Sequence, residues 1–281
     1  MGLGFVGMLW ANRQYQARGV PWGRPLAALL GIISLCSAIS IIIAQLGSGS
    51  GQTKAILERE KKFQYVAYKR LGQEVAKRFP RANILLIREK SYPQLNTGSS
   101  QTTDMNKLQE DAFREGLAGK ARIEAVEQLS SGMDEYMYFD PGPDGKAPTE
   151  IDYKKLQEEL FTGEKLDKLI EDYPNCNVVV SFLGLPQDMK TMKLWTKKPD
   201  ERPALVLAQP YIYELKPLIK LKYCPIILYN KPLKGEGILD MEFPDNEEEA
   251  FNKRYLLITP ENVDQIAKEY PKLFAPDPKK K

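Results

Sequence analysis

Six short apolar runs recur along the chain after residue 80, and each has the length of a β-strand. They lie at residues 82–87, 121–126, 177–183, 204–208, 225–229 and 255–259. The stretches between them carry helical patterns, at residues 104–118, 152–172, 187–196, 211–222 and 260–270. Short Val/Ile/Leu strands that alternate with helices are typical of a mostly parallel sheet covered on both faces.

This alternation predicts an α/β fold: a single three-layer domain, Rossmann-like or flavodoxin-like, over residues 81–274. The right-handed crossover rule places the strand near Asn83 in the centre of the sheet. The strand near Ala121 then lies beside it, at an edge. Residues 54–80 are predicted to form a helix that leads into this domain, and the tail 275–281 is predicted to be disordered.

Local signals at the predicted helix ends agree with this pattern. Thr103 is placed to cap the helix at 104–118, and Gly119 is placed to end it. Thr259, Pro260 and Glu261 supply a cap, an N1 proline and an early acid for the last helix. Residues 133–150 and 231–250 are rich in Pro, Gly and acids and are predicted to be long surface loops.

Residues 25–46 form a run of 22 residues without a charge, PLAALLGIISLCSAISIIIAQL. As a helix this run reaches about 33 Å, which spans a hydrocarbon core of roughly 30 Å. A secretory signal peptide is the alternative, but signal segments have shorter apolar regions and a small-residue cleavage site. Cys36 lies inside the run after Leu35, which does not fit a lipoprotein signal. The sequence therefore favours a retained transmembrane helix.

The Gly/Ser run at residues 47–53, followed by Lys54, has two interpretations. A phosphate-binding Walker loop needs G-x-x-x-x-G-K-[ST] after a short strand, and neither the spacing nor the preceding segment fits. A flexible linker requires only a composition rich in Gly and Ser, which this run has. Arg13, Arg18 and Arg24 precede the apolar run with no acid in residues 1–24. The positive-inside rule then places residues 1–24 in the cytoplasm and the large domain outside.

The composition excludes several kinds of chemistry but does not identify a function. The 281 residues include 40 Lys and Arg against 37 Asp and Glu, which is no nucleic-acid signature. No histidine is present, so Ser-His-Asp and Cys-His catalysis are excluded, together with nearly all zinc chemistry. Asp140-Pro-Gly-Pro-Asp144-Gly lacks calcium ligands at positions 3 and 12, so we predict an ordinary turn and no metal site.

Polar side chains that follow the predicted strands are the candidates for ligand binding, because ligands sit beyond the carboxyl ends of open α/β sheets. Asn96, Thr97, Gly98, Ser99, Ser100 and Thr103 follow the first strand and open a helix, where hydroxyls and backbone N–H groups favour an anion. The other candidates follow later strands: Ser181, Gly184, Gln209, Tyr211, Asn230 and Lys231, with Lys231 as a counter-charge.

Three further features have a structural interpretation. Cys176 and Cys224 precede strands that the order 2-1-3-4-5 separates by about 9.6 Å, so two buried free thiols are predicted. The acidic runs Glu158-Glu159 and Glu247-Glu248-Glu249 are predicted to be solvated surface, with no evident partner for acid/base chemistry. Tyr211 and Tyr213 begin a helix, where aromatics more often belong to the core or rim than to a stacking site.

Two resemblances to known families accompany these patterns. The loop NTGSSQTT at residues 96–103 resembles the phosphate loop of flavodoxins, although it is longer, and this resemblance implies FMN or a phosphate ligand. GQEVAKRFPRANILLI, LQEDAFREGLAGKARIEAV, LDKLIEDYPNCNVVVSFLG and RPALVLAQPY resemble the first lobe of type I periplasmic substrate-binding proteins over residues 70–270. Those proteins have two lobes, whereas only 52 residues follow Tyr229 here, so the resemblance implies a single lobe.

The sequence favours a single-pass protein of a bacterial inner membrane with a periplasmic or extracellular domain. That domain is predicted to be a non-catalytic binding or scaffolding module, without a cofactor and without a nucleic-acid partner. Its expected partners are the membrane and other proteins of an envelope complex, or a second copy in a homodimer. Two alternatives stay open: a small-ligand receptor or sensor of the periplasmic-binding type, and a flavodoxin-like carrier of FMN or a phosphate ligand.

Overall fold

The computed structural model describes residues 54–90, 101–130, 160–186, 188–198, 201–210, 212, 215–232 and 241–275, with the side chains of residues 101–104 left aside. The chain divides into two units, residues 1–59 and 60–281. The sheet and the helices that cover it belong to the second unit, except for residues 54–59 at the start of the helix at 54–78. The predicted transmembrane helix, the linker, the loop 133–150 and nearly all of the tail lie outside the described residues.

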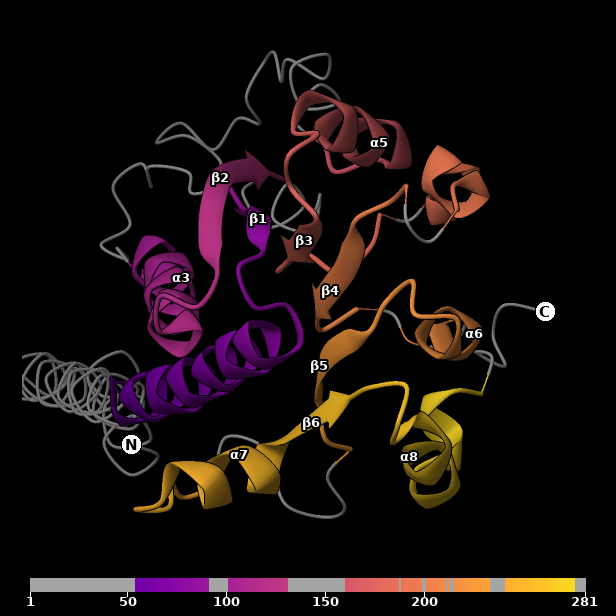
Figure 1. Ribbon diagram of the computed structural model, residues 1–281. Coiled ribbons are helices and arrows are strands. Elements are labelled where there is room, and N and C mark those ends of the chain that lie inside the picture. The colour runs from indigo at the N-terminus through magenta and orange to yellow at the C-terminus, as the bar shows by residue number, and fades with distance from the viewer. Residues whose placement is uncertain are drawn as a thin grey trace, which may run out of the picture. The chain divides into compact units, whose positions relative to one another are not determined.

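The second unit contains one six-stranded sheet in the order β2-β1-β3-β4-β5-β6 (Figure 1). Its strands are β1 Asn83–Glu89, β2 Arg122–Leu129, β3 Val178–Ser181, β4 Ala204–Ala208, β5 Ile226–Asn230 and β6 Tyr255–Ile258. The first five are parallel, and β6 runs antiparallel to β5. The predicted parallel-dominated sheet is confirmed, with β2 at the edge and β1 beside it in the interior.

Two groups of helices cover the two faces of the sheet. The helix at residues 54–78, α3 (Gln101–Leu117) and α7 (Glu247–Arg254) pack on one face. The other face carries α5 (Gly163–Asp172), α6 (Leu215–Lys220), α8 (Val263–Glu269) and the 3-10 turns η2 (Met189–Thr191), η3 (Lys193–Thr196) and η5 (Pro271–Leu273). In β3, Val178 and Val180 face the first group while Val179 faces the second, so apolar residues line both faces.

The helix at 54–78 crosses α3 at a contact between two glycines. A Cβ on Gly72 would lie 2.3 Å from the carbonyl oxygen of Phe113. One on Gly116 would lie 2.1 Å from the carbonyl oxygen of Lys69. Only glycine permits two helix backbones to approach so closely, and the sequence pattern had not indicated this contact.

Several predicted helix boundaries are wrong. The helix predicted at 152–172 falls within the described residues only from residue 160 on, and there α5 begins at Gly163, where the Thr162 hydroxyl accepts a hydrogen bond from the Lys165 N–H. The helix predicted at 187–196 is instead a pair of short 3-10 turns. Of the helix predicted at 211–222, the described residues hold α6, which ends at Lys220, two residues before the predicted end.

Of the predicted helix-end residues, Gly119 is confirmed, and Thr103 and Thr259 are wrong. α3 begins at Gln101, so Thr103 lies inside the helix and is not its cap. Gly119 follows the end of α3 with a positive φ of 70°, as expected for a terminating glycine. Asn262 takes the capping position of α8, and its side-chain oxygen accepts a hydrogen bond from the Thr259 N–H. The expected cap at Thr259 is therefore wrong by three residues.

The helix α7 was not predicted, since residues 231–250 had been assigned to a loop. The Asn246 side chain caps it by accepting hydrogen bonds from the N–H groups of Glu248 and Glu249. The three glutamates fill the first turn, where the partial positive charge of the helix end favours carboxylates. The acidic run is thus a helix start as well as a surface.

Candidate functional site

The described candidates from the sequence lie at the carboxyl ends of three neighbouring strands. Ser181 ends β3, Gln209 directly follows β4, and Asn230 ends β5. Residues 96–100 and Tyr211 lie outside the described residues, and Thr103 is placed only as backbone in α3. Strands β3, β4 and β5 are adjacent and parallel, so the topology brings three of the predicted side chains to one edge of the sheet.

The hydroxyl of Ser181 is buried at this edge without a partner. Ser181 is 2% exposed, and its Oγ makes no hydrogen bond to any residue that the structure describes. A buried polar group without a partner costs about 1–3 kcal/mol, and native proteins keep few of them. Ser181 therefore marks a place where a hydrogen-bonding group from a bound molecule would be stabilising.

Gln209, which follows the neighbouring strand β4, has an unusual backbone conformation. Its φ is +51°, in the left-handed region that favours glycine. Its Oε1 accepts a hydrogen bond of 3.1 Å from the Asn230 side-chain amide. The other polar atom of that amide, Asn230 Oδ1, is buried and has no partner among the described residues. Two side-chain amides are thus fixed side by side, with acceptor capacity left over.

The loops after β3 and β4 press against each other at this edge. Gly184 has a φ of +73°, and a Cβ added there would lie 2.9 Å from the Cα of Pro210. A side chain at residue 184 would therefore push the two loops apart. Gly184 therefore allows the two backbones to approach closely. Its predicted role in ligand binding is a separate matter.

Lys231 is engaged with α7. Its ammonium donates to the carbonyl oxygen of Asn252 at 3.2 Å, and its N–H donates to the carbonyl oxygen of Arg254 at 2.8 Å. It follows β5, which lies three strands from β1, about 14 Å at the usual strand spacing. The hydrogen-bonding groups left at the edge, those of Ser181, Gln209 and Asn230, are neutral.

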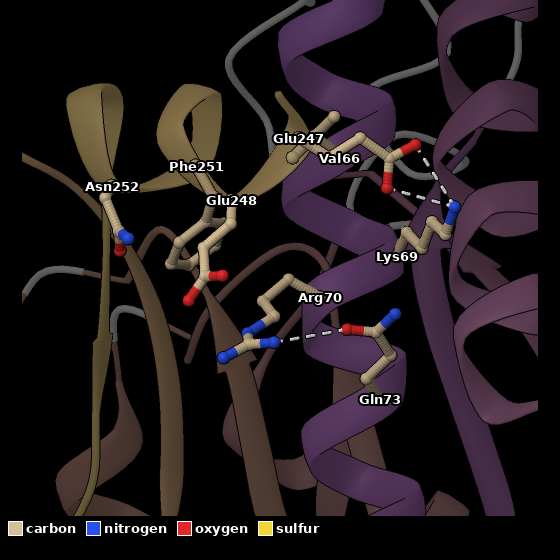
Figure 2. A pocket seen from close by; sticks show the side chains of 8 residues that line it. All are labelled: Val66, Lys69, Arg70, Gln73, Glu247, Glu248, Phe251 and Asn252. Carbon is tan, nitrogen blue, oxygen red and sulfur yellow. Dashed lines mark hydrogen bonds and ion pairs between the residues drawn. The ribbon is translucent and has the colours of Figure 1, made fainter. Parts of the chain in front are cut away.

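A second feature is a groove between the helix at 54–78 and α7, shown in Figure 2. Its volume is about 190 Å³, and it is lined by Val66, Lys69, Arg70, Gln73, Glu247, Glu248, Phe251 and Asn252. Typical ligand pockets measure about 300–1,000 Å³, so this groove is small. The sequence could not indicate it, because it exists only where α7 packs against the first helix.

Charges in the groove are used to fasten the two helices together. The Lys69 ammonium lies 3.1 Å from carboxylate oxygens of both Glu115 and Glu247. The hydrogen bond to Glu247 raises the pKa of Lys69, and the hydrogen bond from Tyr65 lowers the pKa of the Glu115 carboxyl. Glu247, from an acidic run that is predicted to be solvated surface, thus takes part in an ion pair. Figure 2 shows Lys69 reaching toward Glu247 across the groove.

The two cysteines of the domain are the next predicted feature. Cys176 and Cys224 are both buried and free, as predicted. Burial raises the pKa of both thiols, that of Cys224 to about 12. Within the described part of the chain, no group of three or more Cys, Asp or Glu is placed to hold a metal ion. No helix of those residues is long and apolar enough to cross a membrane.

No protein-family model matches the chain, and no curated protein matches it. Solved structures do resemble it. One is GanP, a glucose-galactose binding protein from Geobacillus stearothermophilus, at 11% identity and a TM-score of 0.43, covering 71% of this chain and 61% of that one. AraP, an arabinose binding protein from the same organism, has 11% identity and a TM-score of 0.40, covering 72% and 62%.

A third structure of this kind is a periplasmic ribose ABC transporter protein from Conexibacter woesei, at 9% identity and a TM-score of 0.41, covering 73% of this chain and 60% of that one. The chain spans about three fifths of the length of these proteins. Each of these likenesses has a TM-score below 0.5. The sugars named for those proteins are properties of those proteins.

Proposed function

We propose that the domain is a single-lobe, non-catalytic binding module that takes a small neutral molecule at the carboxyl edge of β3, β4 and β5. The observation that carries this proposal is Gln209, a residue other than glycine in a left-handed conformation. Such a conformation costs roughly 1–2 kcal/mol, and strained residues cluster at ligand sites. Glycine would relieve the strain, but it would remove the amide that Asn230 holds in place.

The groups available at this edge define the class of ligand. The Ser181 hydroxyl and the two amides can donate or accept hydrogen bonds, and none of the three is charged. Alcohol groups of a sugar or another polyol satisfy such groups without bringing a charge out of water. D-Galactose and L-arabinose are therefore suitable first probes.

Replacing Gln209 with glycine is expected to weaken binding of such a sugar about tenfold or more, because one or two hydrogen bonds are lost. The same change is expected to raise the melting temperature slightly, because the backbone strain is relieved. The measurement is calorimetric titration of the full chain with each sugar, alongside thermal unfolding.

Ala118→Gly is the matched control, since Ala118 also has a positive φ, 48°, at the end of α3. It should raise stability similarly and leave sugar binding unchanged. Equal sugar affinity in the Gln209→Gly variant and the parent protein would contradict the proposed site. Heat on adding FMN or inorganic phosphate, with none from sugars, would support the flavodoxin-like alternative at residues 96–103. In that case Gly98→Val with Lys231→Ala should abolish the signal.

We also propose that residues 25–46 anchor this domain to a bacterial inner membrane, with residues 1–24 in the cytoplasm. The uncharged length of the run and the arginines before it support this topology. Protease added to spheroplasts should digest residues 52–281 and spare an N-terminal tag. A protected C-terminal domain would overturn it. Recovery of a stable protein complex with the detergent-solubilised chain would favour a scaffolding subunit over a lone receptor.

A further inference from the structure

A second surface of the domain has features that binding at the carboxyl edge does not use. It surrounds the turn between α6 and β5, which lies at the amino end of β5, opposite to the carboxyl edge. Leu221 in this turn is 65% exposed, and among the described residues it is the large apolar side chain left open to solvent. A single exposed leucine is common on protein surfaces, so the case for a function depends on the residues near it.

The backbone of this turn holds a lysine where glycine is favoured. The Tyr223 N–H donates to the Leu218 carbonyl at 2.8 Å, and the Lys222 N–H donates to the Ile219 carbonyl at 2.9 Å. This pair of bonds is the Schellman arrangement at a helix end, whose left-handed residue is usually glycine. Here that residue is Lys222, with a φ of +59°. The chain thus keeps a charge at a position where glycine would be more stable.

Four lysines lie on this turn and on the segment after η3. Lys220 and Lys222 flank it in sequence, and Lys197 and Lys198 follow η3. The Tyr223 hydroxyl donates to the Trp195 carbonyl at 3.1 Å, and their rings lie 5.4 Å apart, so η3 packs beside the turn. The Arg202 guanidinium stacks 3.4 Å from the centre of the Tyr223 ring. The turn that carries Leu221 is therefore firmly packed and lies next to the segment that carries Lys197 and Lys198.

These lysines are neutralised unevenly. Lys220 pairs with Asp264 of α8 at 2.8 Å, and Lys198 approaches Glu201 at 3.9 Å. Lys197 and Lys222 make no ion pair with any residue that the structure describes. These two lysines lie on the two segments that Tyr223 and Trp195 join.

We propose that Leu221, Lys197, Lys198, Lys220 and Lys222 form a docking surface for an acidic segment of a partner protein, with an apolar side chain of that segment against Leu221. Protein interfaces combine an apolar centre with a polar rim, and complementary charge gives them specificity. A nucleic-acid or lipid surface would be matched by a row of free cations without an apolar centre. Because this surface and the carboxyl edge lie at opposite ends of the strands, a ligand and a partner can bind together.

The test uses the full chain and a short synthetic peptide of Glu and Asp residues around a central Leu. A second peptide has Ser in place of that Leu. Binding is followed by fluorescence anisotropy at low and physiological salt. The leucine peptide should bind more tightly than the serine peptide, and the difference should disappear in the Leu221→Ser variant, with a loss of about tenfold. Added salt should weaken the binding of both peptides.

Lys222→Gly separates recognition from folding. It should weaken binding of the leucine peptide by roughly threefold, the range of one exposed charge, while raising the melting temperature. Arg81→Gly is the matched control, since it removes a cation with a φ of +65° at the start of β1. It should raise the melting temperature and leave peptide binding unchanged.

Three results would overturn the proposal. The first is no binding of either peptide. The second is equally tight binding of phosphatidylglycerol vesicles or single-stranded DNA that Leu221→Ser does not change, which would show a general anion surface. The third is a lower melting temperature for Lys222→Gly, because the lysine would then serve the fold and not a partner.

Discussion

Replacing Gly116 with alanine is expected to lower the free energy of unfolding by about 3 kcal/mol. The added Cβ would lie 2.1 Å from the Lys69 carbonyl oxygen and 3.0 Å from the Gly72 Cα, and both are backbone atoms that cannot rotate away. The helix at 54–78 and α3 must therefore separate, which loosens the apolar layer around Leu71 and Phe113. For a domain of this size the melting temperature should fall by roughly 6–12 °C.

Gly119→Ala is the control for this change. Gly119 has a φ of +70°, but an added Cβ would meet no atom within 4 Å. Its cost is therefore limited to backbone strain, about 1 kcal/mol, which chemical denaturation can measure beside Gly116→Ala. Equal and small effects at the two glycines would show that the helices are not in such close contact.

Arg254→Ala is expected to destabilise the domain by a similar amount, about 3 kcal/mol. Arg254 is 7% exposed, and its guanidinium lies 2.6 Å from the Glu60 carboxylate, whose side chain is 25% exposed. The guanidinium also lies 4.9 Å from the centre of the Phe63 ring. Removing it leaves a partly buried carboxylate without its partner and opens space between α7 and the first helix.

The double variant Glu60→Gln with Arg254→Met should recover part of the loss, since neither side chain is then charged. Arg114→Ala provides the comparison with an exposed pair, because Arg114 is 46% exposed beside Glu110. It should change the free energy of unfolding by no more than about 1 kcal/mol. Urea unfolding of these three variants decides the matter, and a cost for Arg254→Ala no greater than that for Arg114→Ala would refute the buried ion pair.

The sheet could be predicted because its strands carry their own signal. β3 and β4 are continuous apolar runs, VVVS and ALVLA, buried on both faces, and such runs are recognisable without any tertiary information. The helix α7 carries little signal, since only Ala250, Phe251 and Arg254 of its eight residues are buried. Its glutamate-rich first turn is as compatible with a surface loop as with a helix start, so the groove that depends on it was missed as well.

The candidate site shows the same division. That Ser181, Gln209 and Asn230 lie at one edge follows from strand ends alone, and so could be predicted. The positive φ of Gln209 could not be, because only glycine and asparagine suggest that conformation in a sequence. The Gly72–Gly116 contact likewise joins residues far apart in the chain. Features that arise only where two segments contact each other leave no pattern within either segment, so the sequence does not predict them.

Binding at the carboxyl edge is tested most directly by hydrogen–deuterium exchange of the full chain with and without saturating D-galactose or L-arabinose. A bound ligand protects the backbone that it orders. The account predicts slower exchange in peptides that contain residues 181–184, 209–210 and 229–231, and no change at Lys69, Arg70 or Glu248. Protection confined to the groove of Figure 2, or no protection with any neutral sugar, would contradict it.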